Sequence, residues 1–164
     1  MIKIEKGFKL NRSNELVYLT IPSFEHTKLV KHCFTTRVGG VSKGIYSSLN
    51  TSPLKEDPVE NVLKNLDAVC SAVDIDYRKL VLPEQTHEDN IRIVTEKDIG
   101  KGLMKTSDIK NTDGLMTNIP GIPLITFYAD CVPLFFLDTK KKVIALVHSG
   151  WKGTVLKIGA KAIN

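Results

Sequence analysis

Short apolar runs, separated by turn-forming residues, dominate the chain and predict more strands than helices. Several neighbouring runs are joined by short turns, which favours a mixed sheet in an α+β fold over a doubly wound parallel sheet. The segment 96–111 is charged and contains glycine, so it is predicted to be a loop. The predicted strands span residues 16–21, 29–35, 79–82, 91–95, 114–117, 122–128, 133–137 and 142–147.

One long amphipathic helix is predicted after Asp57. Asp57 is a residue type that favours the N-cap, and Pro58 suits the first helical position. Apolar residues then recur at helical spacing from Val59 to Val73, which gives the helix one apolar face. Cys70 lies on that face and is predicted to be a small buried core residue. A second helix is predicted to begin after Gly153.

The composition predicts one globular domain that covers residues 1–164. The chain is 42% hydrophobic and 25% charged, and it contains no repeat, low-complexity tract or Gly/Ser linker. Its net charge is +5, but the basic residues are scattered, and the densest run, 140–142, is predicted to be a solvated turn between strands. A nucleic-acid partner is not expected, because it would require a clustered basic stripe with interleaved aromatics.

The three cysteines favour a reducing compartment. They form no Cys-x-x-Cys pair, so we expect no disulfide framework. The first residues, 1–6, contain no apolar stretch of the kind found in secretory signals, and no apolar run approaches the roughly 18 residues that span a bilayer. We therefore expect a cytoplasmic protein without membrane contact.

Three residues are candidates for a metal site: His87, Cys131 and His148, each placed where a predicted strand or loop meets a turn. Zinc binds Cys thiolates and His nitrogens, and three protein ligands leave the fourth position free, as in catalytic sites. Their long spacings are unlike those of a zinc finger. The alternative is that each histidine is an ordinary surface or core residue and that Cys131 is an inert buried thiol. Asp130 is either exposed or holds a ligand histidine.

A second candidate site is the loop that contains Arg37, Gly39 and Gly40. Two glycines allow backbone N–H groups to turn inward around an anion, and Arg37 adds a planar set of donors for phosphate or carboxylate. The alternative is a hairpin-like turn with an exposed arginine. The chain contains neither Gly-x-Gly-x-x-Gly nor a Walker-type loop, which argues against Rossmann and P-loop functions.

Taken in order along the chain, several motifs resemble those of the laccase-domain family, and the resemblance extends over residues 32–164. That family has been labelled polyphenol oxidoreductase, peptidoglycan editing factor and zinc-dependent purine nucleoside phosphorylase with adenosine deaminase activity. The motifs are Phe34-Thr35-Thr36-Arg37-Val38-Gly39-Gly40-Val41-Ser42, Ser48-Leu49-Asn50, Gln85-Thr86-His87, Ala129-Asp130-Cys131-Val132-Pro133 and His148-Ser149-Gly150-Trp151-Lys152-Gly153.

The resemblance implies a fold and a ligand set. The fold would be a mixed β-sheet sandwich flanked by helices, in α/β/β/α layers. His87, Cys131 and His148 match the metal ligands of the family one for one. Arg37 matches an arginine near the active-site pocket, and Lys152 stands where the family usually has arginine. Family members also continue well beyond the helix at the end of this chain, which predicts a C-terminally incomplete domain.

The function that the resemblance implies is phosphorolysis of purine nucleosides. Adenosine, inosine, guanosine or 5′-methylthioadenosine would react with phosphate to give a base and ribose 1-phosphate, and adenosine would also be deaminated. Zinc would be held by the three ligands, with copper as the alternative metal. Phosphate would be bound by Arg37, Gly39, Gly40 and Lys152, and Asp130 is the candidate for proton transfer. The sequence indicates no oligomeric state.

Three other functions remain open. One is a metal-free hydrolase acting on a peptidoglycan precursor, with Cys131 as nucleophile and His148 as base. Another is copper-dependent phenol oxidation, although a single His₂Cys centre could not perform multi-copper chemistry. The last is an inactive fragment that serves as a binding module.

Overall fold

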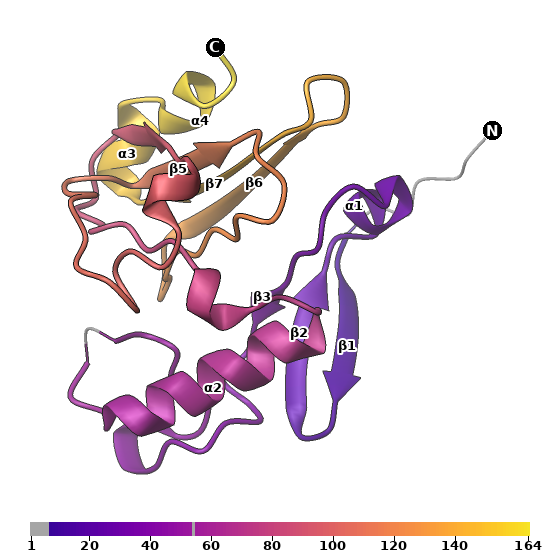
Figure 1. Cartoon of the computed structure of the whole chain (residues 1–164), viewed down its shortest axis with the longest axis vertical. Helices are drawn as coiled ribbons and strands as arrows, with labels where there is room; N and C mark the ends of the chain where they lie inside the picture. Colours follow the sequence, from indigo (N-terminus) through magenta and orange to yellow (C-terminus); the bar gives the residue numbers. More distant parts are fainter. Residues whose placement is uncertain (1–6, 54) are drawn as a thin grey trace. The chain divides into compact units, whose positions relative to one another are not determined.

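The structure is a computed structural model that describes residues 7–53 and 55–164. The segment 1–6, where the sequence predicts no secretory signal, lies outside the described residues. The chain divides into two compact units, an N-terminal unit of residues 1–77 and a C-terminal unit of residues 78–164 (Figure 1). Each unit contains its own sheet and a few helices, so the predicted α+β class is confirmed. That the two units make a single domain stays a prediction.

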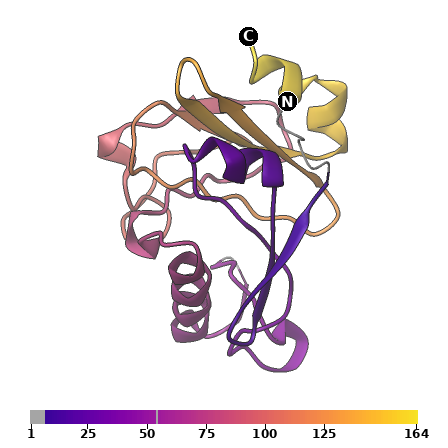
Figure 2. The same ribbon diagram turned by 90° about the vertical axis from the view of Figure 1, so that its right-hand side faces the viewer.

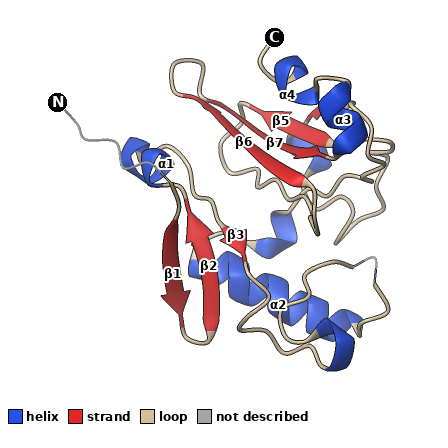
Figure 3. Cartoon of the chain, turned by 180° about the vertical axis from the view of Figure 1, so that it is seen from behind, coloured by secondary structure: helices blue, strands red, loops and turns tan. Residues whose placement is uncertain are grey.

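The N-terminal unit contains a three-stranded antiparallel sheet and one long helix (Figure 3). The strand order is β1-β2-β3, and a core cluster contains Leu16, Leu49 and Val69, which come from β2, a loop and α2. Its elements are β1 (Lys9–Ser13), β2 (Leu16–Thr20), α1 (Pro22–Thr27), β3 (Phe34–Thr35), a 3₁₀ helix (Gly44–Tyr46) and α2 (Val59–Ala72).

Helix α2 begins one residue later than a cap at Asp57 would require. The carbonyl of Pro58 accepts the first helical hydrogen bonds, from the amides of Asn61 (2.9 Å) and Val62 (3.3 Å), so Pro58 is the N-cap residue. The predicted capping role of Asp57 is therefore wrong. Its carboxylate instead accepts hydrogen bonds from the side chains of Ser42 (2.6 Å), Asn50 (3.0 Å) and Asn61 (3.3 Å), which fastens the loop before the helix. Cys70 is buried in α2, as predicted.

A mixed four-stranded sheet in the order β4-β5-β7-β6 forms the centre of the C-terminal unit. Strands β4 and β5 pair in parallel, and the other two pairs are antiparallel. The elements are a 3₁₀ helix across the unit boundary (Tyr77–Lys79), β4 (Ile91–Ile93), a 3₁₀ helix (Glu96–Asp98), β5 (Gly114–Thr117), β6 (Val132–Asp138), β7 (Val143–Ser149), α3 (Trp151–Val155) and α4 (Ile158–Lys161).

Two core clusters enclose this sheet. Ile158 of α4 and Ala162, just after that helix, pack against Ala145 and Val147 of β7. Figure 2 shows the C-terminal helices, in yellow, beside the strands of this sheet. The loops contribute to a second cluster, which includes Val81, Val94, Ile109, Leu115 and Ile122. Because β7 lies between two other strands, its C-terminal end is well buried, and the polar side chains there need partners inside the protein.

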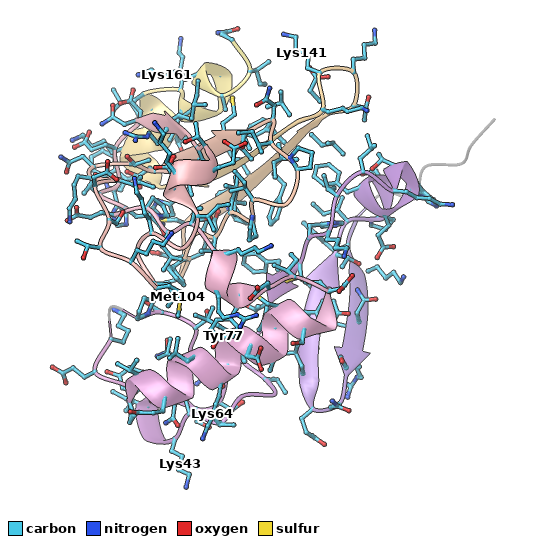
Figure 4. The ribbon with its side chains drawn as sticks, in the orientation of Figure 1. Lys43, Lys64, Tyr77, Met104, Lys141 and Lys161 are labelled. Atoms are coloured by element: carbon cyan, nitrogen blue, oxygen red, sulfur yellow. The ribbon has the colours of Figure 1, made fainter. Side chains whose placement is uncertain are left out.

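The charged groups at the outside of the C-terminal unit agree with the predicted pattern. The run 140–142 lies in the exposed turn between β6 and β7, and Figure 4 shows Lys141 at that turn. Lys161, also labelled in Figure 4, forms an ion pair with Asp89. No helix in the described part of the chain combines the length and apolar character that crossing a membrane would require.

Three predicted strands differ from the structure. Only Phe34 and Thr35 of the segment 29–35 pair with a neighbouring strand. The segments 79–82 and 122–128 form no strand and share a single bridge, between Val81 and Leu124. Residues 122–128 are apolar because they contribute to the core, and Pro123 cannot donate a ladder hydrogen bond.

Candidate metal centre

The three predicted metal ligands come from two strands and one loop of the C-terminal unit. His148 belongs to β7, whereas Cys131 immediately precedes β6 and does not follow a strand as the sequence predicted. Strands β6 and β7 are antiparallel, with Val132 opposite Ser149, so the start of β6 lies beside the end of β7. His87 belongs to the loop that leads into β4.

The structure brings these side chains together. The candidate ligand atoms of His87, Cys131 and His148 all lie within 4.8 Å of one another. The two imidazole rings meet edge to face, with their centroids 4.8 Å apart. His148 is buried, Cys131 is half-buried and His87 is exposed, so one side of the group is open to solvent. Across residues 7–53 and 55–164, no other group of at least three such side chains is close enough to hold a metal.

Gly150 leaves room where the three donors meet. A Cβ atom at this position would lie 3.2 Å from Cδ2 of His87, 3.3 Å from Sγ of Cys131 and 3.7 Å from Cε1 of His148. The backbone at Gly150 is extended, with φ −72°, and any residue could adopt it. A larger residue here would press against the side chains of His87 and Cys131, so glycine is favoured for space and not for conformation. Two imidazoles and a thiol are donors that suit zinc and also copper, so the residues present fit a metal ion.

Asp113 connects two of the candidate ligands. Its buried carboxylate accepts a hydrogen bond from Nδ1 of His148 at 2.8 Å, and the backbone amides of Thr86, His87 and Glu88 donate to it at 3.1, 3.0 and 2.9 Å. Burial alone would raise the pKa of Asp113, but the bond from His148 and the three amides lower it overall. With Nδ1 of His148 engaged, Nε2 is the nitrogen available to a metal.

Gln85 connects the His87 loop to the segment that leads to Cys131. Its side-chain amide donates to the carbonyl of Phe127 at 2.9 Å and accepts from the amide of Phe127 at 2.7 Å. Gln85 thus satisfies the backbone of Phe127, beyond the bridge that Leu124 forms with Val81. Tyr128 follows, with its ring centroid 5.5 Å from that of His148, and burial raises the pKa of its phenol to about 12.

The surroundings of Cys131 disfavour a free thiolate. Partial desolvation, followed by the negative charge of Asp130, raises the pKa of the Cys131 thiol. The exposed Asp130 carboxylate lies 3.9 Å from Sγ. A metal-free cysteine nucleophile requires the opposite, an environment that lowers the thiol pKa. A bound cation would supply such an environment.

Lys152 and Trp151 follow the site on α3. The ammonium of Lys152 pairs with the carboxylate of Glu88, the residue after His87. Lys152 is therefore close to the His87 loop, but it already has a partner. Trp151 is 78% exposed, so it does not fill a core position.

The predicted anion-binding loop lies in the N-terminal unit, where both glycine amides and one N–H of the Arg37 guanidinium already have acceptors. The amides of Gly39 and Gly40 donate to Oγ of Ser48 at 3.1 and 3.3 Å, and the guanidinium of Arg37 donates to the carbonyl of Ser47 at 2.9 Å. A Cβ at Gly40 would lie 2.2 Å from the Ser48 carbonyl oxygen, so close backbone approach explains this glycine. An anion at these amides would have to displace the Ser48 hydroxyl.

Sequence reasoning missed the residues that hold the ligands in place. Asp113 lies in Asn111-Thr112-Asp113-Gly114, whose composition is that of an ordinary turn. Gln85 and Gly150 lie inside recognisable motifs, but their partners are distant in sequence and only the fold identifies them.

The comparison with protein families agrees with this geometry. Residues 31–164 match the family described as multi-copper polyphenol oxidoreductase laccase. The chain belongs to this family. Among curated relatives in it, purine nucleoside phosphorylase YlmD of Bacillus subtilis (strain 168) is 39% identical over 141 residues, which cover 85% of this chain and 51% of that protein. A purine nucleoside phosphorylase of Bacteroides thetaiotaomicron is 33% identical over 159 residues, covering 96% and 56%.

Solved structures show the same fold. The hypothetical protein YfiH of Bacillus licheniformis matches with a TM-score of 0.85 and 34% identity, over 97% of this chain and 58% of that one. YlmD from Geobacillus stearothermophilus matches with a TM-score of 0.83 and 28% identity, over 95% and 57%. The chain spans about half the length of the curated relatives it matches.

Proposed function

We propose that this chain carries the metal centre of a zinc-dependent purine nucleoside phosphorylase. The observation that carries the proposal is the convergence of His87, Cys131 and His148 beside Gly150. The names of the relatives from Bacillus subtilis and Bacteroides thetaiotaomicron support phosphorolysis of purine nucleosides. The expected products are a free base and ribose 1-phosphate, and we further propose that the same site deaminates adenosine.

The residues of the chain have distinct roles in this proposal. His87, Cys131 and His148 hold the metal, and a zinc ion with three protein ligands supplies Lewis-acid chemistry at its fourth position. Lys152 contributes positive charge beside the His87 loop, and it must exchange Glu88 for phosphate to do so. Asp130, exposed next to Cys131, is the proposed proton-transfer group.

A separate set of phosphate donors is proposed within the N-terminal unit. Arg37 and the amides of Gly39 and Gly40 would exchange their present partners, the Ser47 carbonyl and the Ser48 hydroxyl, for phosphate oxygens. A charged phosphate is a stronger acceptor than a hydroxyl, which favours the exchange.

Zinc phosphorolysis accounts for the site better than multi-copper oxidation does. Within the described residues, the chain offers donors for one metal ion, whereas multi-copper chemistry requires several metal ions held close together. We therefore propose zinc as the metal. The substrates would be purine nucleosides and phosphate, and the three free cysteines are compatible with a cytoplasmic location.

Metal analysis joined to an adenosine assay tests this function. The purified chain should contain one zinc ion and should convert adenosine in a phosphate-dependent reaction, whereas Cys131→Ser should lose both the metal and the activity. Cys33→Ser, which alters a free thiol in the N-terminal unit, is the matched control and should keep both. YlmD of Bacillus subtilis serves as the positive control. Zinc-loaded chain without activity on any purine nucleoside would contradict the proposal.

Arg37→Ala tests the phosphate donors separately. A hydrogen bond to a charged group contributes roughly 1.5–3 kcal/mol, so the apparent phosphate affinity should fall about ten- to a hundredfold. Deamination of adenosine needs no phosphate and should change little. Arg12→Ala, on the exposed side of β1, is the control. An equal loss of both reactions would assign Arg37 to the fold or to nucleoside binding.

A further inference from the structure

We infer that Asp113 is a positioning residue that holds His87 and His148 in ligating geometry before a metal binds. This inference rests on the metal centre of the proposed function, but it concerns how the chain builds that centre and not which reaction follows. Asp113 is fully buried immediately before β5, and its carboxylate contacts both histidines, one through a backbone amide and the other through a ring nitrogen.

The first contact fixes the His87 loop. His87 has φ +63°, in the left-handed region that residues with a Cβ seldom adopt. In this conformation the amides of Thr86, His87 and Glu88 all donate to the Asp113 carboxylate. Successive backbone amides that surround one anion form a nest. In this nest the anion is the carboxylate of Asp113, a side chain of the same unit. The interaction stabilises an otherwise unfavourable backbone and directs the His87 ring towards Cys131.

The second contact fixes the ring of His148. The Asp113 carboxylate accepts a hydrogen bond from Nδ1 at 2.8 Å, and the Asp113 carbonyl accepts one from the His148 amide at 2.7 Å. The side-chain bond sets both the orientation of the ring and its tautomer, leaving Nε2 on the side of the other ligands. One carboxylate therefore sets the relative positions of a loop ligand and a strand ligand.

An amide at this position would not replace the carboxylate. Oδ1 accepts from His87 and His148, while Oδ2 accepts from Thr86 and Glu88. If the oxygen of an asparagine occupied the first position, its NH₂ group would face the two backbone donors, with only the Thr86 hydroxyl, 3.4 Å away, as an acceptor. The rotated amide would instead lose the bonds to both histidines. Either arrangement loosens the loop or the ring.

Asp98 provides a matched control in the same unit. It is also a buried aspartate whose carboxylate accepts from a backbone amide, that of Thr95, at 2.9 Å, and it pairs with Lys101 at 2.7 Å. It contacts none of the three candidate ligands through any hydrogen bond in the described structure. Asp98→Asn therefore reproduces the loss of a buried carboxylate without altering the ligands.

The experiment compares zinc affinity, cobalt absorption and amide exchange in wild type, Asp113→Asn and Asp98→Asn. Partners that orient metal-ligating histidines typically contribute ten- to a hundredfold to affinity, and we expect such a loss in Asp113→Asn by chelator competition. Cobalt should bind more weakly and with altered absorption bands. In metal-free protein, the amides of residues 86–88 should exchange faster. Asp98→Asn should bind zinc and cobalt as wild type does, even if it is less stable.

Two outcomes overturn the inference: wild-type metal affinity in Asp113→Asn, or equal losses in Asp113→Asn and Asp98→Asn. If Asp113→Asn does not fold by circular dichroism, Asp113→Glu replaces it, because it keeps the charge but displaces the carboxylate, and it should weaken zinc binding to a similar extent. These readouts need no nucleoside. If the wild-type protein binds zinc but does not catalyse phosphorolysis, the proposed function is rejected. The zinc affinities of the variants would still support the positioning role of Asp113.

Discussion

The loop around Gly40 in the N-terminal unit and the loop around His87 in the C-terminal unit both direct successive backbone amides at one side chain. In the first loop, the amides of Gly39 and Gly40 donate to the neutral hydroxyl of Ser48. In the second, three amides donate to the charged carboxylate of Asp113, which also binds the ring of His148. The first loop requires glycine, whereas the second places a histidine at positive φ.

The difference shows how one backbone arrangement can close on a neutral hydroxyl or hold a candidate metal ligand in place. A hydroxyl can accept few hydrogen bonds, and the Ser48 hydroxyl also donates to the carbonyl of Arg37. All of its bonds are therefore made within the loop around Gly40. A buried carboxylate accepts more bonds, and stronger ones. It can therefore hold a loop with an unfavourable backbone and still orient a second side chain. The ring of His87 takes no part in these bonds and remains available to a metal ion.

The largest expected effect comes from filling the space at Gly40. In Gly40→Ala, the Cβ would lie 2.2 Å from the Ser48 carbonyl oxygen and 2.6 Å from Cα of Leu49, so the backbone would have to shift. We expect a loss of about 3 kcal/mol in the free energy of unfolding, measured with urea. Zinc affinity should not change.

Gly159→Ala is the control for Gly40→Ala. Its new Cβ would meet only the end of the Leu134 side chain, at 3.1 Å. It should cost little stability. A stable Gly40→Ala protein would show that the loop is less tightly closed than the structure indicates.

Ser48→Ala should have a smaller effect, since it removes the acceptor but creates no clash. Two amides and one carbonyl lose a partner, and we expect a loss of about 2 kcal/mol in unfolding free energy. Ser47→Ala, on an exposed neighbour, is the control. A marked drop in zinc affinity in Ser48→Ala would remove the contrast between this loop and the loop that holds a candidate metal ligand.

The smallest effect is expected at Asp57, a carboxylate without any ligand to position. The hydrogen bond from Ser42, followed by those from Asn50 and Asn61, lowers the pKa of Asp57. A lowered folded-state pKa stabilises the protein above the unfolded pKa, and this contribution disappears as the pH falls through the folded value. The difference in stability between wild type and Asp57→Asn should therefore be largest near neutral pH and vanish in acid.

Urea unfolding at several pH values, with zinc content measured in parallel, checks this expectation. A difference in stability that persists below the folded-state pKa of Asp57 would mean that the side chain stabilises the protein through packing and not through its charge. Lost zinc in a folded Asp57→Asn protein would connect it to the metal centre.

The sequence predicted the sheet of the C-terminal unit well, and its loops poorly. The segment 114–117 coincides with β5, and 142–147 falls almost entirely within β7, because apolar strands bounded by turn residues are local signals. The segment 122–128 has equally apolar residues but forms no strand. Its backbone at Phe127 is satisfied by the side chain of Gln85, a contact between residues far apart in sequence.

The candidate ligands were predictable, but the residues that support them were not. His87, Cys131 and His148 are chemically distinctive and lie in specific motifs, so resemblance identified them before the structure did. Asp113 precedes a glycine in a turn-like stretch, and a local pattern cannot indicate that three amides and an imidazole converge on it. The predicted N-cap at Asp57 failed because its carboxylate bonds to Ser42 and Asn50 in the preceding loop, which the residue pattern at the helix start does not indicate.

The position of β7 between β5 and β6 has a consequence for synthesis on the ribosome. Strand β7 follows both of its neighbours in the chain, so neither can pair with it until residues 143–149 have emerged. Chains are made at about 5–20 residues per second, and N-terminal parts fold first. Until β7 is complete, a nascent chain has His87 and Cys131 but lacks His148. The metal centre can therefore assemble only after β7 has left the ribosome.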